Sequence, residues 1–154
     1  MIYGAILEKG ERWYTDMSKI VDILGNKINE YNWLITDFMF NEADVIQGEY
    51  GFLSGEQLIN MSKKNMQWIW AVVSGIKKEI PLDEILKYPL PYADGYSGFW
   101  KNPLSIQHPL ADVEIVPWDS SLTLLIAKDK ELVDMYRKKF PLSEDLERYN
   151  EQFA

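Results

Sequence analysis

The chain has 154 residues, no cysteine and a formal net charge of −8. A chain of this length can bury a core without disulfides, and the lack of cysteine excludes disulfide frameworks and thiolate chemistry. Because nucleic-acid binding depends mainly on neutralising phosphates, the acidic balance argues against that function. The N-terminus lacks a signal-peptide pattern and no apolar stretch approaches the roughly 18 residues of a membrane span. We therefore expect one cytoplasmic domain over residues 1–154, with no membrane association.

Hydrophobic periodicity predicts alternating strands and helices in the first half of the chain. Tyr31–Phe40 is apolar on both faces, which is typical of a central strand. Ser54 and Gln57 have the spacing of a capping box, so a helix is expected to begin there. The other expected elements are a strand over Ile2–Leu7, a helix from Thr15 or Asp16 to about Gly25, a polar connector over Glu42–Phe52, a strand over Gln67–Ile76 and a helix beginning at Pro81.

The second half begins with a long segment, residues 88–111, that has no periodicity. A hairpin follows, with strands Val113–Pro117 and Leu122–Ala127 joined by a turn that contains Asp119 and Ser120. Two helices end the chain, one from Lys128 or Asp129 to Pro141 and one opened by Leu142 and Ser143. The pattern predicts an α+β fold, with a single mixed β-sheet of about five strands and helices packed mainly on one face.

Charge is unevenly distributed along the chain. Between Lys27 and Lys63 there is no lysine or arginine, whereas six acidic residues fall in this stretch. Such a stretch is either a solvated surface or a docking surface for a basic partner. The candidate partner-binding carboxylates are Asp37, Glu42, Asp44 and Glu49.

The long segment 88–111 is rich in aromatic residues and proline, which argues against disorder. Tyrosine and tryptophan are enriched at binding hot spots, because they bury a large area at low entropic cost. The same residues could instead pack onto the sheet as additional core. The candidate anchors for a partner are Tyr92, Tyr96 and Trp100.

Catalytic and metal-binding patterns are weak. One histidine and no cysteine leave no ligand set for zinc or copper, and no calcium-binding or phosphate-binding loop is present. His108 would have to be the base of any Ser-His-Asp triad, but no nucleophile elbow accompanies it, so we interpret it as a surface or hydrogen-bonding residue. Carboxylates near the aromatic segment could form a glycosidase pair, although so many acidic residues produce such pairs by chance. We predict no catalytic residue, no metal site and no cofactor.

The C-terminal quarter has a distinctive pattern: Val113–Val133, which holds Trp118-Asp-Ser-Ser121 between two strands, followed by Phe140–Leu146. These residues resemble the C-terminal part of small bacterial proteins, some of which are similar to immunity proteins of bacterial toxin systems. The resemblance implies a stand-alone acidic domain that binds another protein. It carries no catalytic motif and no binding residue over to this chain.

The leading hypothesis is therefore a non-enzymatic protein of the immunity or inhibitor type, which occludes a basic partner such as a toxin. An acidic face can mimic the phosphates that a basic nuclease grips. The alternative is a small hydrolase or carbohydrate-binding domain centred on residues 88–111, which predicts a pocket enclosing Trp100 with two carboxylates. A homo-oligomer formed through an exposed strand edge is a third hypothesis.

Overall fold

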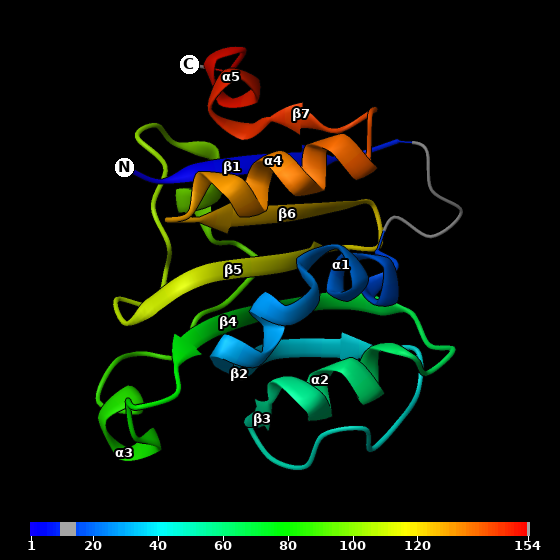
Figure 1. The fold of residues 1–154 in the computed structure, drawn as a ribbon, viewed down its shortest axis with the longest axis vertical. Coiled ribbons are helices and arrows are strands. Elements are labelled where there is room, and N and C mark those ends of the chain that lie inside the picture. Colours follow the sequence, from blue (N-terminus) through cyan, green and yellow to red (C-terminus); the bar gives the residue numbers. More distant parts are fainter. Residues whose placement is uncertain (10–14, 154) are drawn as a thin grey trace.

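The computed structural model describes residues 1–9 and 15–153 (Figure 1). Over these residues the strands are β1 (Tyr3–Leu7), β2 (Tyr31–Phe40), β3 (Tyr50–Ser54), β4 (Trp68–Lys77), β5 (Ala111–Trp118), β6 (Leu122–Ala127) and β7 (Glu144–Asp145). The α-helices are α1 (Met17–Leu24), α2 (Gly55–Ser62), α3 (Leu82–Ile85), α4 (Lys130–Lys139) and α5 (Leu146–Glu151). Two 3-10 helices are η1 (Gly25–Glu30) and η2 (Ser97–Trp100).

The strands form one sheet in the order β3-β2-β4-β5-β6-β1-β7, and each pair of neighbours is antiparallel. The α+β class is confirmed, but the prediction of a mixed sheet of about five strands is wrong. A helix between two strands suggests a parallel crossover, yet here α1 links strands that are not neighbours. Strands β4, β5 and β6 lie between β1 and β2, so no parallel pair results.

The two additional strands are the short ones at the sheet edges. The sequence predicts a connector over Glu42–Phe52, but β3 begins at Tyr50 and pairs with β2. Strand β7 consists of Glu144 and Asp145, which pair with β1. Two consecutive carboxylates carry no strand signal, because edge pairing depends on backbone groups that the residue types do not reveal.

Polar caps set where the helices begin. Asp16 accepts from the backbone N–H of Lys19 to cap α1, and the predicted capping box of Ser54 and Gln57 opens α2. The last helix begins at Leu146, after Asp145 as its N-cap, and not at the predicted Leu142 and Ser143. Ser143 instead donates to the carbonyl of Phe140 at 2.6 Å, which uses its hydroxyl in the turn before β7.

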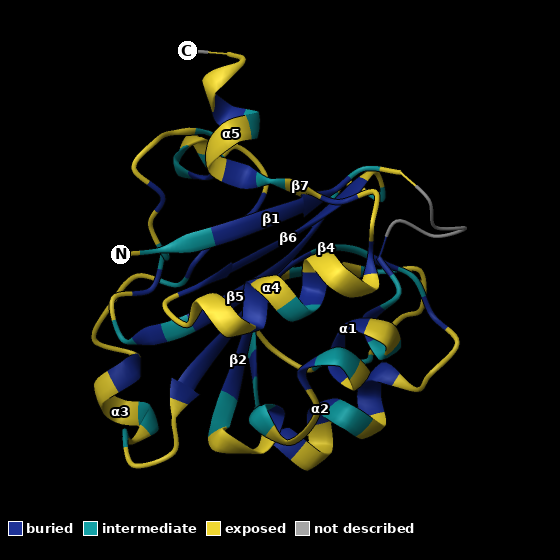
Figure 2. Cartoon of the chain, turned by 45° about the horizontal axis from the view of Figure 1, so that its top comes forward, coloured by how far each residue is buried: buried dark blue, intermediate teal, exposed yellow. Residues whose placement is uncertain are grey.

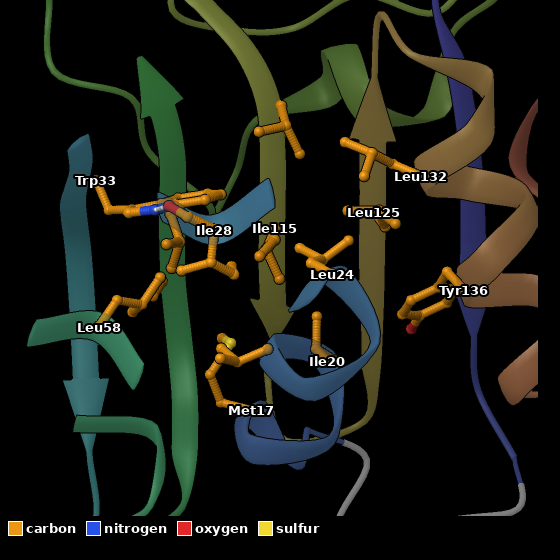
Figure 3. Close-up of a cluster of buried hydrophobic side chains, with 14 of the residues drawn as sticks. Met17, Ile20, Leu24, Ile28, Trp33, Leu58, Ile115, Leu125, Leu132 and Tyr136 are labelled. Carbon is orange, nitrogen blue, oxygen red and sulfur yellow. Dashed lines mark hydrogen bonds between the residues drawn. The ribbon is translucent and has the colours of Figure 1, made fainter. Parts of the chain in front are cut away.

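Helices α1, α2 and α4 cover one face of the sheet, which we call the front face (Figure 1). The core beneath them is apolar and fully buried, and its labelled side chains come from both layers (Figure 3). Trp33 projects into this core from β2, and its indole Nε1 donates to the carbonyl of Ile28 at 2.9 Å. The buried indole donor therefore has a partner, as buried donors require.

The opposite face, the back face, is covered mainly by the irregular segment 88–110, here called the long loop (Figure 1). Phe99 and Leu104 of the long loop pack against Val72, Val116 and Leu124 of the sheet. Helices α3 and α5 add one buried apolar residue each to this side, Ile85 and Leu146. The central strands are therefore buried from both sides (Figure 2), which explains why β2 and β4 are apolar on both faces.

Candidate functional site

Carboxylates from the central strands hold the long loop on the back face. Asp37 Oδ2 accepts from the backbone N–H groups of Ala93 at 2.7 Å and Asp94 at 3.2 Å. Glu114 Oε2 accepts from the N–H of Gln107 at 3.0 Å. Each carboxylate supplies acceptors to backbone donors that would otherwise lack partners in a loop without regular structure.

Asp37 can reach the loop because β2 is irregular at this point. The pairing of β2 with β4 shifts between Thr36 and Met39, and Asp37 has a φ of 48°. Aspartate tolerates this left-handed conformation better than most residues. The sequence offers Asp37 as a contact for a partner, but its side chain is bonded to the protein's own loop.

Glu114 is completely buried on β5. Burial raises the pKa of its carboxyl from 4.5 to about 7, and the hydrogen bond from Gln107 offsets part of that effect. Its Oε1 has no partner among the described residues, and neither does the Oγ of Ser74, the residue paired with it on β4. A carboxyl so enclosed is suited to hold the loop and is poorly placed to reach a substrate.

His108 fastens the other end of the long loop and is buried. Its Nδ1 accepts from the N–H of Leu110 at 3.1 Å, so the proton is assigned to Nε2, which donates to the carbonyl of Ile85 at 3.1 Å. Burial lowers its pKa, and the bond to Ile85 opposes that shift. Both ring nitrogens are occupied, which agrees with the hydrogen-bonding role expected for this histidine.

The aromatic residues of the long loop form a continuous row of ring contacts. Tyr92 contacts Tyr96, Tyr96 contacts Phe99, and Phe99 contacts Trp100, with centroid distances of 5.3, 4.7 and 6.0 Å. Phe99 is buried, whereas the side chain of Tyr92 is 48% exposed and Trp100 is partly buried. The row therefore begins at the surface, passes through the core and ends at a second exposed site.

That site is an open pocket of about 540 Å³, which we call the aromatic pocket. Its walls come from the end of β1, the 3-10 helix η2, the β5–β6 hairpin and the C-terminal helix. The lining residues are Glu8, Trp100, Trp118, Ser121, Leu122, Tyr149 and Phe153. A pocket of this size falls within the range of small-ligand sites.

The aromatic walls meet at steep angles. The ring of Trp100 is perpendicular to that of Trp118, with centroids 5.7 Å apart. Tyr149 lies 6.3 Å from Trp100 at 50°, and Phe153 lies 5.2 Å from Tyr149 at 55°. Trp118 is supported from behind by Trp70, at 5.1 Å. The pocket therefore has faces turned in several directions, unlike a flat stacking platform.

Glu8 is the one carboxylate among the described residues that line the pocket. Its Oε1 accepts from the hydroxyl of Tyr149 at 2.9 Å. Burial raises the pKa of Tyr149 to about 12, and the bond to Glu8 adds to the shift, so the phenol stays protonated. The buried Nε1 of Trp118 has no partner within the described part of the chain. The pocket thus offers π faces and one carboxylate, while the indole donor of Trp118 is buried behind its wall.

The seven predicted partner-binding residues do not form one site. Glu42, Asp44 and Glu49 are exposed in the connector between β2 and β3, at one edge of the sheet. Trp100 lies in the aromatic pocket, which includes Glu8 at the end of β1 and so lies toward the opposite edge of the sheet. Of the other three, Asp37 binds the backbone of the long loop, and Tyr92 and Tyr96 belong to the outer part of that loop.

Of the residues that line the pocket, sequence reasoning predicted only Trp100 as a site residue and missed Glu8, Trp118, Ser121, Leu122, Tyr149 and Phe153. Tyr149 and Phe153 have the spacing of a buried helix stripe, so they resemble core residues in the sequence. Phe153 is in fact exposed, which its position near the chain end could have suggested. Glu8 gives no such signal, because only the antiparallel arrangement brings the end of β1 beside the last helix.

Two structural findings limit the kinds of site. In the ranges 1–9 and 15–153, no group of three potential ligands could hold a metal ion. None of the helices there is long and apolar enough to cross a bilayer. No family model, curated protein or solved structure matches the chain.

Proposed function

We propose that this chain is a non-enzymatic binding domain that engages a basic protein partner through the aromatic pocket. The observation that carries the proposal is the composition of the pocket, whose described lining holds two tryptophans, a tyrosine, a phenylalanine and one carboxylate. Tryptophan and tyrosine dominate binding hot spots. A positively charged side chain is the natural complement to π faces beside an anion.

The mechanism proposed is occlusion, as in an inhibitor or immunity protein. A side chain of the partner enters the pocket, and the surrounding surface covers the partner's functional site. Trp100 is the central anchor, since it contacts both Trp118 and Tyr149. It is held from the interior by Phe99, so its orientation is set before a partner binds.

The acidic connector has a different role in this proposal. Glu42, Asp44 and Glu49 lie at the far edge of the sheet from the pocket, so one small contact cannot include both. Exposed carboxylates act over distance by raising the rate at which a basic partner arrives. They therefore support steering, while the pocket supports affinity.

The test begins with isolation of the partner by affinity capture, followed by calorimetry of the purified pair. We expect Trp100→Ala to weaken binding by at least about 2 kcal/mol, or roughly thirtyfold. Leu142→Ala is the matched control, because Leu142 is an exposed apolar side chain that is not part of the pocket. An unchanged affinity for folded Trp100→Ala would rule out the pocket as the contact.

The steering role is tested separately with the double variant Asp44→Lys and Glu49→Lys. We expect a slower association rate and a weaker dependence of that rate on salt, with little change in dissociation. Stopped-flow mixing at two ionic strengths measures both rates. Identical association rates for the variant and the wild type would remove the acidic connector from the proposal.

A carbohydrate-binding role is the second candidate, and the aromatic lining beside Glu8 favours it. A sugar hydroxyl could donate to Glu8, and an aromatic face would pack against the sugar ring. Hydrolysis is less well supported, since glycosidases use a pair of carboxylates and Glu8 alone lines the described pocket. Binding to a glycan array, lost in Trp118→Phe, is the result expected from this alternative.

A further inference from the structure

We propose that the aromatic pocket is a binding site for a quaternary ammonium group. If a protein partner carries the ammonium group, this inference rests on the proposed function. A free small molecule could carry the same group, and the inference then stands without the proposed function.

The ring geometry favours a rounded cation over a flat ligand. A sugar ring or a nucleobase packs best on one exposed face or between parallel faces. Here Trp100 and Trp118 are perpendicular, and Tyr149 is inclined at 50° to Trp100. Faces turned in several directions can each contact one side of a tetrahedral ammonium group, as in the aromatic cages that bind choline or methylated lysine.

The hydrogen-bonding capacity of the pocket distinguishes a methylated ammonium from a primary one. A lysine ammonium has three N–H donors, each of which needs an acceptor once water is excluded. The described lining is mainly aromatic and apolar, and its side-chain acceptors are confined to Glu8 and the hydroxyls of Ser121 and Tyr149. A quaternary ammonium has no N–H to satisfy, and its methyl groups contact the apolar walls directly.

Glu8 supplies the charge that makes the site selective for a cation. Its carboxylate lies among the aromatic walls and is held in place by the hydroxyl of Tyr149. Glu8 is partly buried beside these aromatic side chains, where a charge interacts with a cation more strongly than in bulk water. An uncharged ligand of the same shape would gain the contacts with the rings but not the attraction to Glu8.

The experiment uses the full chain and compares choline with 3,3-dimethylbutan-1-ol, which has the same shape without the charge. Indole N–H signals in the proton–nitrogen NMR spectrum follow the titration, because Trp100 and Trp118 line the pocket. We expect choline to bind at least tenfold more tightly than the neutral compound. Equal affinities for the two compounds, or no shift with choline at millimolar concentration, would overturn the proposal.

Two variants test the assigned groups. Glu8→Gln keeps the shape of the side chain and should weaken choline binding about fivefold to tenfold, while the neutral compound binds as before. Glu79→Gln removes an exposed carboxylate elsewhere on the surface and is the matched control, with no expected change. A Glu8→Gln variant that binds choline as tightly as the wild type would exclude Glu8 from the site.

The aromatic contribution is tested with Trp100→Ala, for which we expect at least a tenfold loss of choline affinity. Tyr88→Ala is the control, since Tyr88 is an exposed aromatic residue of the long loop that does not line the pocket. Thermal unfolding confirms that each variant is folded. If Trp100→Ala loses its shifts only because it unfolds, Trp118→Phe removes one wall more conservatively and should still weaken binding.

A final comparison identifies the source of the cation. A peptide containing trimethyllysine that binds more tightly than choline indicates a protein-borne group, and equal or weaker binding indicates a free small cation. The proposed function fails independently of this result. A protein partner lost in Trp100→Ala, with no binding of either ammonium compound, would retain the partner site and reject only the quaternary ammonium ligand.

Discussion

The two faces of the sheet are covered in different ways. We expect the front face to contribute more to stability, whereas the candidate binding site lies on the side of the back face. The front face is covered by three helices, whose backbone hydrogen bonds are satisfied within each element (Figure 1). The back face is covered mainly by the long loop, whose backbone donors depend on side chains of the sheet, including Asp37 and Glu114. Helices form their own backbone hydrogen bonds, whereas an irregular loop needs acceptors from other parts of the protein.

This difference also explains where the pocket lies. Helices on the front face pack against the sheet along their full length and leave a continuous apolar core. The long loop ends its row of aromatic contacts at Trp100, beside the β5–β6 hairpin and the C-terminal helix. Side chains from several segments meet there without filling the space between them, which leaves the aromatic pocket.

Removing Trp33 should have the largest effect on stability, because it is among the largest fully buried side chains and belongs to the front-face core. We expect Trp33→Ala to lower the free energy of unfolding by about 4 kcal/mol, through the lost burial and the cavity that remains. The carbonyl of Ile28 also loses its donor. Urea unfolding measures the change.

We expect the removal of Trp100 to lower the free energy of unfolding by less than the removal of Trp33, because Trp100 is only partly buried. We expect Trp100→Ala to cost about 1–2 kcal/mol, since less apolar area leaves water in the folded state. If the two tryptophan variants were equally destabilised, the back face would have to be as important to stability as the front.

Replacing Glu114 tests its role as a buried acceptor through the pH dependence of the free energy of unfolding. The pKa of its carboxyl is about 7 in the folded protein against an ordinary 4.5, so the folded state keeps a proton that the unfolded state releases. Stability from this group is therefore present below pH 4.5 and is lost as pH rises to about 7, by about 3 kcal/mol. Glu114→Gln cannot ionise and should not show this loss.

The measurement is the free energy of unfolding of both proteins at several pH values between 4 and 8. His108 contributes with the opposite sign, because its lowered pKa makes stability fall as pH drops below its ordinary 6.5. That contribution is common to both proteins, so the difference between them isolates Glu114. Parallel pH profiles for the wild type and Glu114→Gln would contradict the assignment.

Removing Asp37 should loosen the long loop without disturbing the front face. Asp37→Ala deletes two hydrogen bonds to backbone N–H groups, which are worth about 1–3 kcal/mol together. We expect faster hydrogen exchange at Ala93 and Asp94, with unchanged protection in the front-face helices. Uniformly faster exchange in both regions would instead indicate global destabilisation.

Asp37→Asn is the matched control for that variant. Asparagine tolerates the left-handed conformation and keeps one acceptor oxygen, so it should restore most of the protection at Ala93 and Asp94. Asp44→Ala provides a second control, because Asp44 is exposed in the connector between β2 and β3. If Asp37→Asn behaved like Asp37→Ala, the backbone conformation and not the acceptor would be the relevant feature.

The same contrast shows how far the sequence could predict the structure. Local patterns located the front face well: Tyr31–Phe40 matches β2 in full, and the capping box at Ser54 opens α2. The turn at Asp119 and Ser120 was also predicted, and both residues adopt the positive φ that such a turn requires. These features depend on residues close together in the chain.

The back face and the pocket depend on contacts between distant residues, and local patterns do not encode them. Asp37 and Ala93 are 56 residues apart, and Glu8 and Tyr149 are 141 apart. Trp100 could be proposed as an anchor from its residue type, but its neighbours in the pocket could not. The edge strands β3 and β7 were missed for the same reason, because their pairing is set by the sheet they join.

The smallest predicted effect concerns the cap of α2 on the front face. Ser54 Oγ accepts from the N–H of Gln57 at 3.2 Å, and Gln57 Oε1 accepts from the N–H of Ser54 at 2.8 Å. We expect Ser54→Ala to lower the free energy of unfolding by about 1 kcal/mol, because one end of the helix loses its acceptor. Urea unfolding at pH 7 measures the change.

Ser54→Asp should restore that loss, since aspartate is also a good N-cap and its charge is favourable at a helix N-terminus. Hydrogen exchange then sharpens the contrast between the faces. The cap joins two residues that are three apart in the sequence, so its removal should affect only the first turn of α2. The loss of Asp37 instead releases the loop at Ala93, which is 56 residues away in the sequence. Faster exchange at Ala93 in Ser54→Ala would contradict this division, because it would couple the front-face helices to the anchorage of the back-face loop.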